Sequence, residues 1–281
     1  MRLKIFFLII LLSFIYSCSN NDEELVQTPN IVAAIKPNKI SSSFPLLAQS
    51  YMGSDPNYYF EYDSQGRITK RIGGFLSFSG GTFPSYFFNS IYTKITYSGN
   101  SASMGEYSSD PNFNIPVKER SLEFDNQGRL VKSVIFQPNY GPIWEKHLTY
   151  NYDGTGKLVE IVTELPNMPY DPTDPSDYIL SYVEKFTYDN SGNLQKATSI
   201  ERHNTVDAYT MSQIEFSNFD NVQNPFSGLG IFEEYFYLSL SKNTPQKRKT
   251  QEFNEIGQLG AHTENTWTNQ YESNGNLKLF Y

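Results

Sequence analysis

Residues 124–130 read Phe-Asp-Asn-Gln-Gly-Arg-Leu, and close variants of this phrase recur along the chain. Each copy has an aromatic residue, then Asp, Asn or Glu, two variable residues, Gly, a polar residue, and Leu or Ile. The six copies occupy residues 62–68, 124–130, 152–158, 188–194, 253–259 and 271–277. Recurrence of one short unit is typical of a repeat architecture.

The chemistry of the unit predicts a β-hairpin with a tight turn. An Asp side chain can hydrogen-bond the backbone of its own turn, and Gly adopts a positive φ angle without steric cost. The aromatic residue and the Leu or Ile then lie as neighbours on one face of the two strands. The residues that we expect to have this structural role are Asp63, Gly66, Asp125, Gly128, Asp153, Gly156, Asp189, Gly192, Gly257 and Gly275.

The segments that flank the turns alternate between apolar and polar residues, as in Leu130-Val131-Lys132-Ser133-Val134. This period of two indicates strands. We therefore predict an all-β fold, an antiparallel meander of hairpins that forms one long, twisted and curled sheet over a single domain, residues 39–281. Residues 97–100 and 219–221 are candidates for degenerate copies of the unit. The aromatic segment 224–240 has no clear periodicity.

The N-terminus has the pattern of an export signal. Basic Arg2 and Lys4 precede an apolar run at residues 5–15, which is shorter than the roughly 20 residues that a transmembrane helix needs. Cys18, the chain's one cysteine, follows directly. An intramolecular disulfide is therefore excluded.

This arrangement resembles the lipobox of bacterial lipoproteins, which implies cleavage after residue 17 and lipidation of Cys18, with palmitate among the acyl groups. Residues 18–38 are then the lipidated cysteine and a flexible tether, and the membrane is a partner through that lipid. An ordinary secretory signal with an incidental cysteine is the alternative, because Tyr16 is bulkier than the residue usual at its position.

Composition limits the possible functions. The formal net charge is −8, and loss of Arg2 and Lys4 with the signal makes the mature chain more negative by two. Nucleic-acid binding depends mainly on Lys and Arg at phosphates, so we expect no nucleic-acid partner. The 21 Tyr and 21 Phe residues supply apolar surface for a folded core.

The repeated unit resembles the YD repeats of Rhs-type proteins and of uncharacterised Bacteroidetes envelope lipoproteins. The second resemblance also rests on residues 219–226 and 235–245, which are similar to phrases in those lipoproteins. It implies an envelope location and a repeat fold, and it implies no activity. The acidic segment 20–24 resembles export signals that direct some of these lipoproteins to the cell surface, although a merely solvated tether explains it equally well.

No established catalytic or cofactor motif is present, so we expect no enzymatic activity and no cofactor. His147, His203 and His262 lie in separate segments and are interpreted as ordinary strand or surface residues. Asp171, Asp174 and Asp177 form a weak candidate calcium site, because calcium prefers several oxygen ligands on a loop. The prolines among them explain the same segment as a stiff connection.

Aromatic residues are candidate sugar-stacking platforms, since their faces bind the apolar faces of pyranose rings. The candidates are Trp144, Trp267, Tyr86, Phe87, Phe88 and Tyr140. We therefore expect a non-enzymatic outer-membrane lipoprotein that binds or scaffolds a glycan or protein ligand, at the cell surface or on the periplasmic face. The first alternative is a periplasm-facing assembly protein that binds envelope partners through exposed strand edges. The second alternative is an enzyme with an unfamiliar site, which would need a histidine clustered with several carboxylates.

Overall fold

The computed structural model describes residues 35–45, 55–76, 86–113, 115, 119–136 and 142–280. Residues Ala34–Tyr281 form one compact unit. The expected signal peptide, Cys18 and most of the tether therefore lie outside the described residues.

The described residues form fourteen strands and two short helical segments. The strands are β1 (Lys39–Ser41), β2 (Asn57–Tyr62), β3 (Ile68–Leu76), β4 (Tyr86–Ser98), β5 (Ser101–Ser108), β6 (Glu119–Phe124), β7 (Leu130–Phe136), β8 (Lys146–Tyr152), β9 (Leu158–Glu164), β10 (Leu180–Tyr188), β11 (Leu194–His203), β12 (Val206–Ser217), β13 (Lys247–Phe253) and β14 (Leu259–Thr266). The 3₁₀ helix η2 (Pro142–Trp144) precedes β8, and the helix α2 (Phe236–Ser239) lies between β12 and β13. No helix in the described part of the chain has the length and apolar character to cross a membrane.

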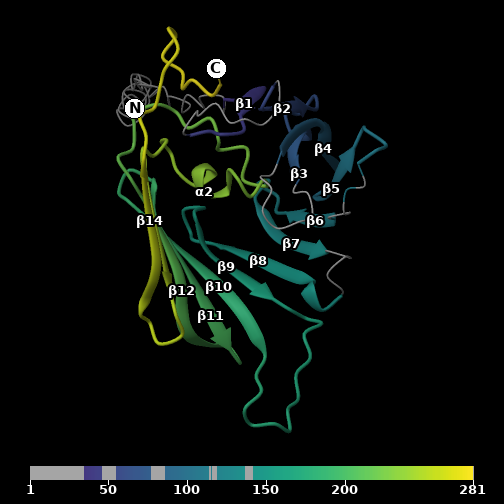
Figure 1. Ribbon diagram of the computed structural model, residues 1–281, viewed down its shortest axis with the longest axis vertical. Helices are drawn as coiled ribbons and strands as arrows, with labels where there is room; N and C mark the ends of the chain where they lie inside the picture. The colour runs from purple at the N-terminus through teal and green to yellow at the C-terminus, as the bar shows by residue number, and fades with distance from the viewer. Residues whose placement is uncertain are drawn as a thin grey trace, which may run out of the picture. The chain divides into compact units, whose positions relative to one another are not determined.

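All fourteen strands belong to one sheet, and their spatial order is their order in the sequence. Every neighbouring pair is antiparallel, as in β6 and β7 or β10 and β11. The predicted all-β antiparallel meander is thus confirmed. β1 and β14 do not pair with each other, so the sheet is open. It curls around the connection between β12 and β13, which carries α2 (Figure 1).

The repeated unit forms the turns of this meander. In the copy at 124–130, the Asp125 carboxylate accepts hydrogen bonds from the backbone N–H groups of Gln127 and Arg129, both at 2.9 Å. Gly128 has a φ of +77°, and its N–H donates to the Asp125 carbonyl. Positive φ recurs at the matching glycine of every copy, Gly66, Gly128, Gly156, Gly192, Gly257 and Gly275.

Strand polarity gives the sheet two ends. The copies with Gly66, Gly128, Gly156 and Gly192 join successive strand pairs at one end, which we call the repeat-turn end. The other end, the loop end, carries the remaining connections, including the one between β9 and β10. The copy with Gly257 joins β13 and β14 at the loop end, because residues 218–246 form the preceding connection.

Two expectations about the repeat need correction. The copy at 271–277 forms an isolated bridge between Tyr271 and Leu277 after the last strand, and so lies outside the sheet. Residues 219–221 join no pair of strands. The Asp220 carboxylate accepts the backbone N–H of Val222, as in a repeat turn, but it also accepts hydrogen bonds from the distant Asn269 and Tyr271. Residues 97–100, by contrast, do join β4 to β5, with Gly99 at a φ of +57°.

Residues 218–246, the inner segment, supply the other half of the core. Phe226 and Phe232 are almost wholly buried in a cluster that includes side chains from β1 to β7. A second cluster is built on β8 to β12, and partly buried Phe236 and Tyr237 pack against it. Burial of each such aromatic ring contributes about 1.5–3 kcal/mol. The inner segment therefore holds the curled sheet together from within.

Candidate ligand-binding cavity

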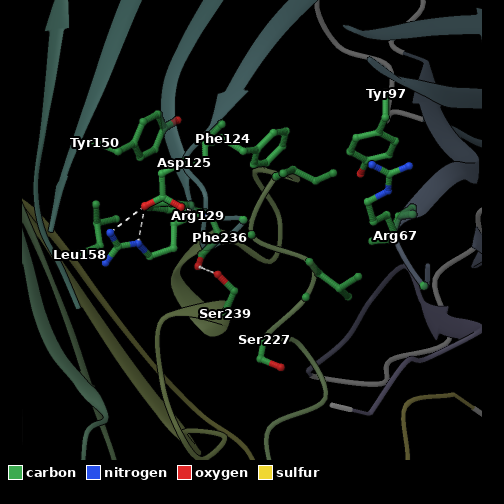
Figure 2. Close-up of a pocket in the computed structure, with 18 of the residues that line it drawn as sticks. Arg67, Tyr97, Phe124, Asp125, Arg129, Tyr150, Leu158, Ser227, Phe236 and Ser239 are labelled. Carbon is green, nitrogen blue, oxygen red and sulfur yellow. Dashed lines mark hydrogen bonds and ion pairs between the residues drawn. The ribbon is translucent and has the colours of Figure 1, made fainter. Parts of the chain in front are cut away.

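A cavity of about 670 Å³ lies between the repeat-turn end and residues 227–240 of the inner segment (Figure 2). Its floor is apolar, with Leu130, Leu158 and Phe236 among the lining side chains. Leu130 packs against both hydrophobic clusters, so the cavity lies where the two clusters meet. A volume of this size is typical of small-molecule sites.

The sequence of the inner segment helps to leave this space open. Ser227, Gly228 and Gly230 line the cavity on the side opposite the turns. A methyl group at Gly228 would meet no atom within 4 Å, and this glycine has no positive φ. Neither the backbone conformation nor close packing therefore requires a glycine at position 228.

Basic side chains lie around the apolar floor. The Arg129 Nε donates to Asp125 Oδ2 at 2.7 Å, and the Arg67 Nε donates in the same way to Asp63 at 2.8 Å (Figure 2 shows the Arg129 pair). Lys36 also lines the cavity, and its ammonium occupies the space where a side chain at Gly66 would lie. The cavity thus combines an apolar interior with three basic side chains, of which Arg67 and Arg129 are paired with the turn aspartates Asp63 and Asp125.

The same arginines connect successive repeats. The Arg67 guanidinium lies over the ring of Tyr97, at 4.2 Å from the centroid. Lys157 lies over Tyr188 in a later repeat, at 5.1 Å. Cation–π contacts of this kind contribute about 0.5–1 kcal/mol at exposed sites. The rim of the cavity is consequently held in place by contacts from each turn to the next.

Hydrogen bonds to backbone and side-chain donors stabilise the charged form of the turn aspartates. The backbone N–H of Arg129 is the main cause that lowers the pKa of Asp125. The pKa of Asp63 is lowered for the matching reason, with Arg67 as donor. Both carboxylates are therefore suited to remain ionised and to orient the arginines beside the cavity.

Three charged side chains on the inner face of the sheet anchor the inner segment. Arg71 forms an ion pair with Glu234 at 2.5 Å, and the Arg120 Nη1 donates to the carbonyl oxygen of Ile231 at 3.0 Å. Tyr237 donates its hydroxyl proton to Glu184 at 2.6 Å. Two smaller cavities, of about 340 and 290 Å³, lie beside these anchors.

Burial raises the pKa of Glu184, and its hydrogen bonds from Tyr237 and Ser199 oppose that effect. Burial also raises the pKa of Tyr58, whose ring lies 4.8 Å from the Arg71 guanidinium. Sequence reasoning did not select Arg71, Arg120 or Glu184. The sequence signal that could have identified these residues is a charged side chain at a position of a strand that alternation predicts to face the core.

The three candidate calcium ligands lie in the connection between β9 and β10, where Asp171 and Asp174 are exposed and Asp177 is half-buried. Asp171 accepts hydrogen bonds from the backbone and hydroxyl of Thr173, and Asp174 accepts the same pair from Ser176. Asp177 accepts the backbone N–H of Asp171 at 2.8 Å. Among the described residues, no group of three or more His, Cys, Asp or Glu is placed to hold a metal ion. The carboxylates instead stabilise successive turns of the loop.

The histidines lie away from the large cavity. His147 and His203 each contact the glutamate two residues before them, at 2.6 and 2.7 Å, and His203 also stacks on Tyr178. His262 is exposed on β14. Such pairs along a strand are consistent with surface roles.

The candidate stacking aromatics are also dispersed. Phe87 is 4% exposed in the core, and Phe88 packs on Phe113. Trp144 is exposed at the loop end, and Trp267 is partly buried at the repeat-turn end. Tyr86 is exposed, and Tyr140 lies outside the described residues. None of these described aromatics lines the large cavity, whose aromatic lining comes mainly from the repeats.

No family model matches the chain, and no curated protein matches it. The solved structures to which the chain is similar include two porin-like proteins. A porin-like protein from Bacteroides uniformis is 14% identical, with a TM-score of 0.45 over 79% of each chain. A porin-like protein from Bacteroides vulgatus is 12% identical, with a TM-score of 0.48 over 86% of this chain and 90% of that one.

Proposed function

We propose that the chain is a non-enzymatic lipoprotein of the cell envelope that binds a small ligand in the 670 Å³ cavity. The envelope location rests on the export signal and Cys18. The binding role rests on one observation, the open cavity with an apolar floor and cationic rim. Geometry of this kind fits a ligand with an apolar body and a negatively charged group, such as an acidic sugar or a short fatty acid.

The side chains of the cavity support binding better than catalysis. A hydrolytic site needs a nucleophile beside a base, or two carboxylates in different environments. The Ser239 hydroxyl donates to the backbone carbonyl of Phe236 at 2.6 Å, and no histidine is among the described lining residues. Asp125 is already engaged by its own turn and by Arg129.

Filling the cavity tests the proposal. We expect Gly228→Phe to abolish binding of dodecanoate and of glucuronic acid, measured by calorimetry, because Gly228 lines the cavity and no atom within 4 Å of its Cβ position prevents a ring from being added there. Gly154→Phe is the matched control, since a side chain at this position also meets no atom within 4 Å and the residue does not line the cavity. Failure of the parent protein to bind either probe, or equal binding by the Gly228 variant, would count against a ligand site here.

An assembly role is the second candidate. β14 is paired only with β13, and its side chains are mostly exposed, so its other edge is available to add a strand from a partner. A cross-linking probe placed at Thr263 of β14 in native cells, compared with the same probe at Thr69 of the interior strand β3, distinguishes the assembly role from the ligand-binding role. Adducts specific to Thr263 would favour assembly.

The side of the membrane on which the domain lies is a separate part of the proposal. Protease treatment of intact native cells, compared with gently lysed cells, tests it. Digestion on intact cells supports the cell surface, and protection until lysis supports the periplasmic face.

A further inference from the structure

Among the residues that the structure describes, the carboxylate of Glu184 has no cationic partner. Its Oε1 accepts hydrogen bonds from the hydroxyls of Tyr237, at 2.6 Å, and Ser199, at 3.5 Å. No described residue donates a hydrogen bond to its Oε2. Burial raises the pKa of Glu184, because the ionised form is less stable there than in water. Charges removed from water are usually paired, so this carboxylate has capacity for a further partner.

Glu184 lines the cavity of about 290 Å³ that lies between the sheet and the inner segment. Small-molecule sites have volumes of roughly 300–1,000 Å³, so this cavity suits a ligand with few heavy atoms. Its walls are mainly aromatic and aliphatic, formed by Leu148, Tyr150, Ile161, Tyr182, Phe236 and Tyr237. Aromatic rings attract cations, and a carboxylate among them adds a stronger attraction of the same kind. The cavity therefore fits an organic cation.

The other charged groups of this cavity also favour a cation over an anion. Glu233 lines it and is exposed. Arg120 is the one basic residue among its described lining residues, and it also lines the adjoining cavity of about 340 Å³. The guanidinium already donates hydrogen bonds to Ser133, Ile231 and Tyr150. Two carboxylates against one guanidinium leave the 290 Å³ cavity with a net negative charge.

We propose that the 290 Å³ cavity binds a primary ammonium compound with a small apolar body, whose ammonium group donates a hydrogen bond to Glu184 Oε2. An ammonium group has three N–H donors, and the hydroxyl oxygens of Thr163 and Ser199 in the same lining are further acceptors. Tyr150 and Phe236 also line the large cavity (Figure 2). The two cavities are thus neighbours, but the ligands proposed for them have opposite charges, and the inference does not depend on the large cavity.

Hexylammonium is the probe, and hexan-1-ol, which has the same chain without the charge, is its control. We expect calorimetry at pH 7 to show that the full chain binds hexylammonium at least about tenfold more tightly than the alcohol. Glu184→Gln removes the charge and keeps the shape, and should weaken hexylammonium binding by at least about tenfold, as expected for the loss of a hydrogen bond to a charged group. Glu160→Gln removes the same charge from the neighbouring strand β9, outside the cavity lining, and should leave the affinity unchanged.

Three outcomes would overturn the proposal. The first is a parent protein that binds no hexylammonium at millimolar concentration. The second is equal affinity of the parent and the Glu184 variant, or equal affinity for the alcohol, because either shows that the carboxylate is not used. The third is loss of hexylammonium binding in Gly228→Phe, which places the probe in the large cavity. Urea unfolding verifies that each variant is folded, so a lost affinity is not a lost structure.

The Gly228 variant also separates this inference from the proposed function. We expect it to lose dodecanoate and keep hexylammonium, whereas Glu184→Gln should lose hexylammonium and keep dodecanoate. Either site can therefore fail its test without affecting the test of the other.

Discussion

The Arg129 guanidinium lies over the ring of Tyr152, with its central carbon 4.6 Å from the ring centroid. Arg129 follows the turn glycine of one repeat, and Tyr152 begins the next. Tyr152 in turn donates its hydroxyl proton to the carbonyl oxygen of Leu130 at 2.8 Å, and Tyr188 donates in the same way to Leu158. Polar residues that look like solvated turn residues thus connect neighbouring hairpins.

Arg129→Met tests this connection. We expect a loss of about 1 kcal/mol in the free energy of unfolding, because the cation–π contact to Tyr152 and the ion pair with Asp125 are both removed while the apolar stem is largely retained. Urea unfolding measures the change. Lys132→Met is the control, since its ammonium lies 4.0 Å from Glu123 and its side chain is 63% exposed. Equal effects of the two changes would show that the contacts of Arg129 with Tyr152 and Asp125 together add no stability.

Gly128→Val tests the turn. The substitution places a branched side chain at a φ of +77°, where we expect a cost of about 1–3 kcal/mol from backbone strain alone. Steric overlap with neighbouring residues adds nothing to this cost, because a Cβ at this position meets no atom within 4 Å. Gly154→Val has equally open space without a positive φ, and should change stability by less than about 0.5 kcal/mol in the same urea titration. A Gly128 variant as stable as the Gly154 variant would contradict the strained turn.

The Arg71–Glu234 pair tests the anchoring of the inner segment. The Arg71 side chain is 8% exposed and lies between the rings of Tyr58 and Phe232. Glu234→Ala leaves this buried charge without its carboxylate, and we expect a loss of about 2 kcal/mol, reduced from the value for a fully buried pair because Glu234 is 41% exposed. Adding Arg71→Met should recover part of the loss. If the double variant is less stable than Glu234→Ala, the guanidinium itself is the main contributor.

Glu184→Gln tests a buried carboxyl. Its pKa is raised in the folded protein, so the folded state binds this proton more tightly than the unfolded state does. Stability therefore falls as the pH rises from the unfolded pKa, about 4.3, through the folded one. The variant cannot ionise, so its stability relative to the parent should be greater at pH 7 than at pH 4. Urea unfolding across this range should show the divergence, and a constant difference would indicate that Glu184 ionises without penalty.

The parts of the fold that could be predicted are local in origin. The Asp125 carboxylate and the positive φ of Gly128 satisfy their turn within a few residues, so six short phrases suffice to indicate hairpins. The alternation in residues 130–134 likewise reports on the two faces of one strand. These local signals suffice to predict a meander, because in a meander each strand pairs with the next strand in the sequence.

The cavity and the inner segment depend on contacts between distant residues, and no local pattern reveals them. Asp220 follows an aromatic residue as in a repeat, yet it bonds Asn269 and Tyr271, about fifty residues away. Phe226 and Phe232 are buried because a curled sheet surrounds them, which their own neighbours in sequence do not indicate. Gly228 lies beside open space, whereas a Cβ at Gly230 would meet the Ser239 hydroxyl at 2.6 Å, so two similar glycines in the sequence differ in their reason and neither alone reveals the cavity.

The backbone N–H of Ser41 in β1 donates to the carbonyl oxygen of Leu279 at 2.8 Å. During synthesis, Ser41 is made long before Leu279, whose carbonyl it bonds, while hairpins such as β6–β7 can pair as soon as both strands are made. Domains made from the N-terminus onward expose such unfinished edges to aggregation. Early in its life, the protein thus carries an uncovered first strand, and a chaperone that shields it until the C-terminal residues arrive would serve this topology well.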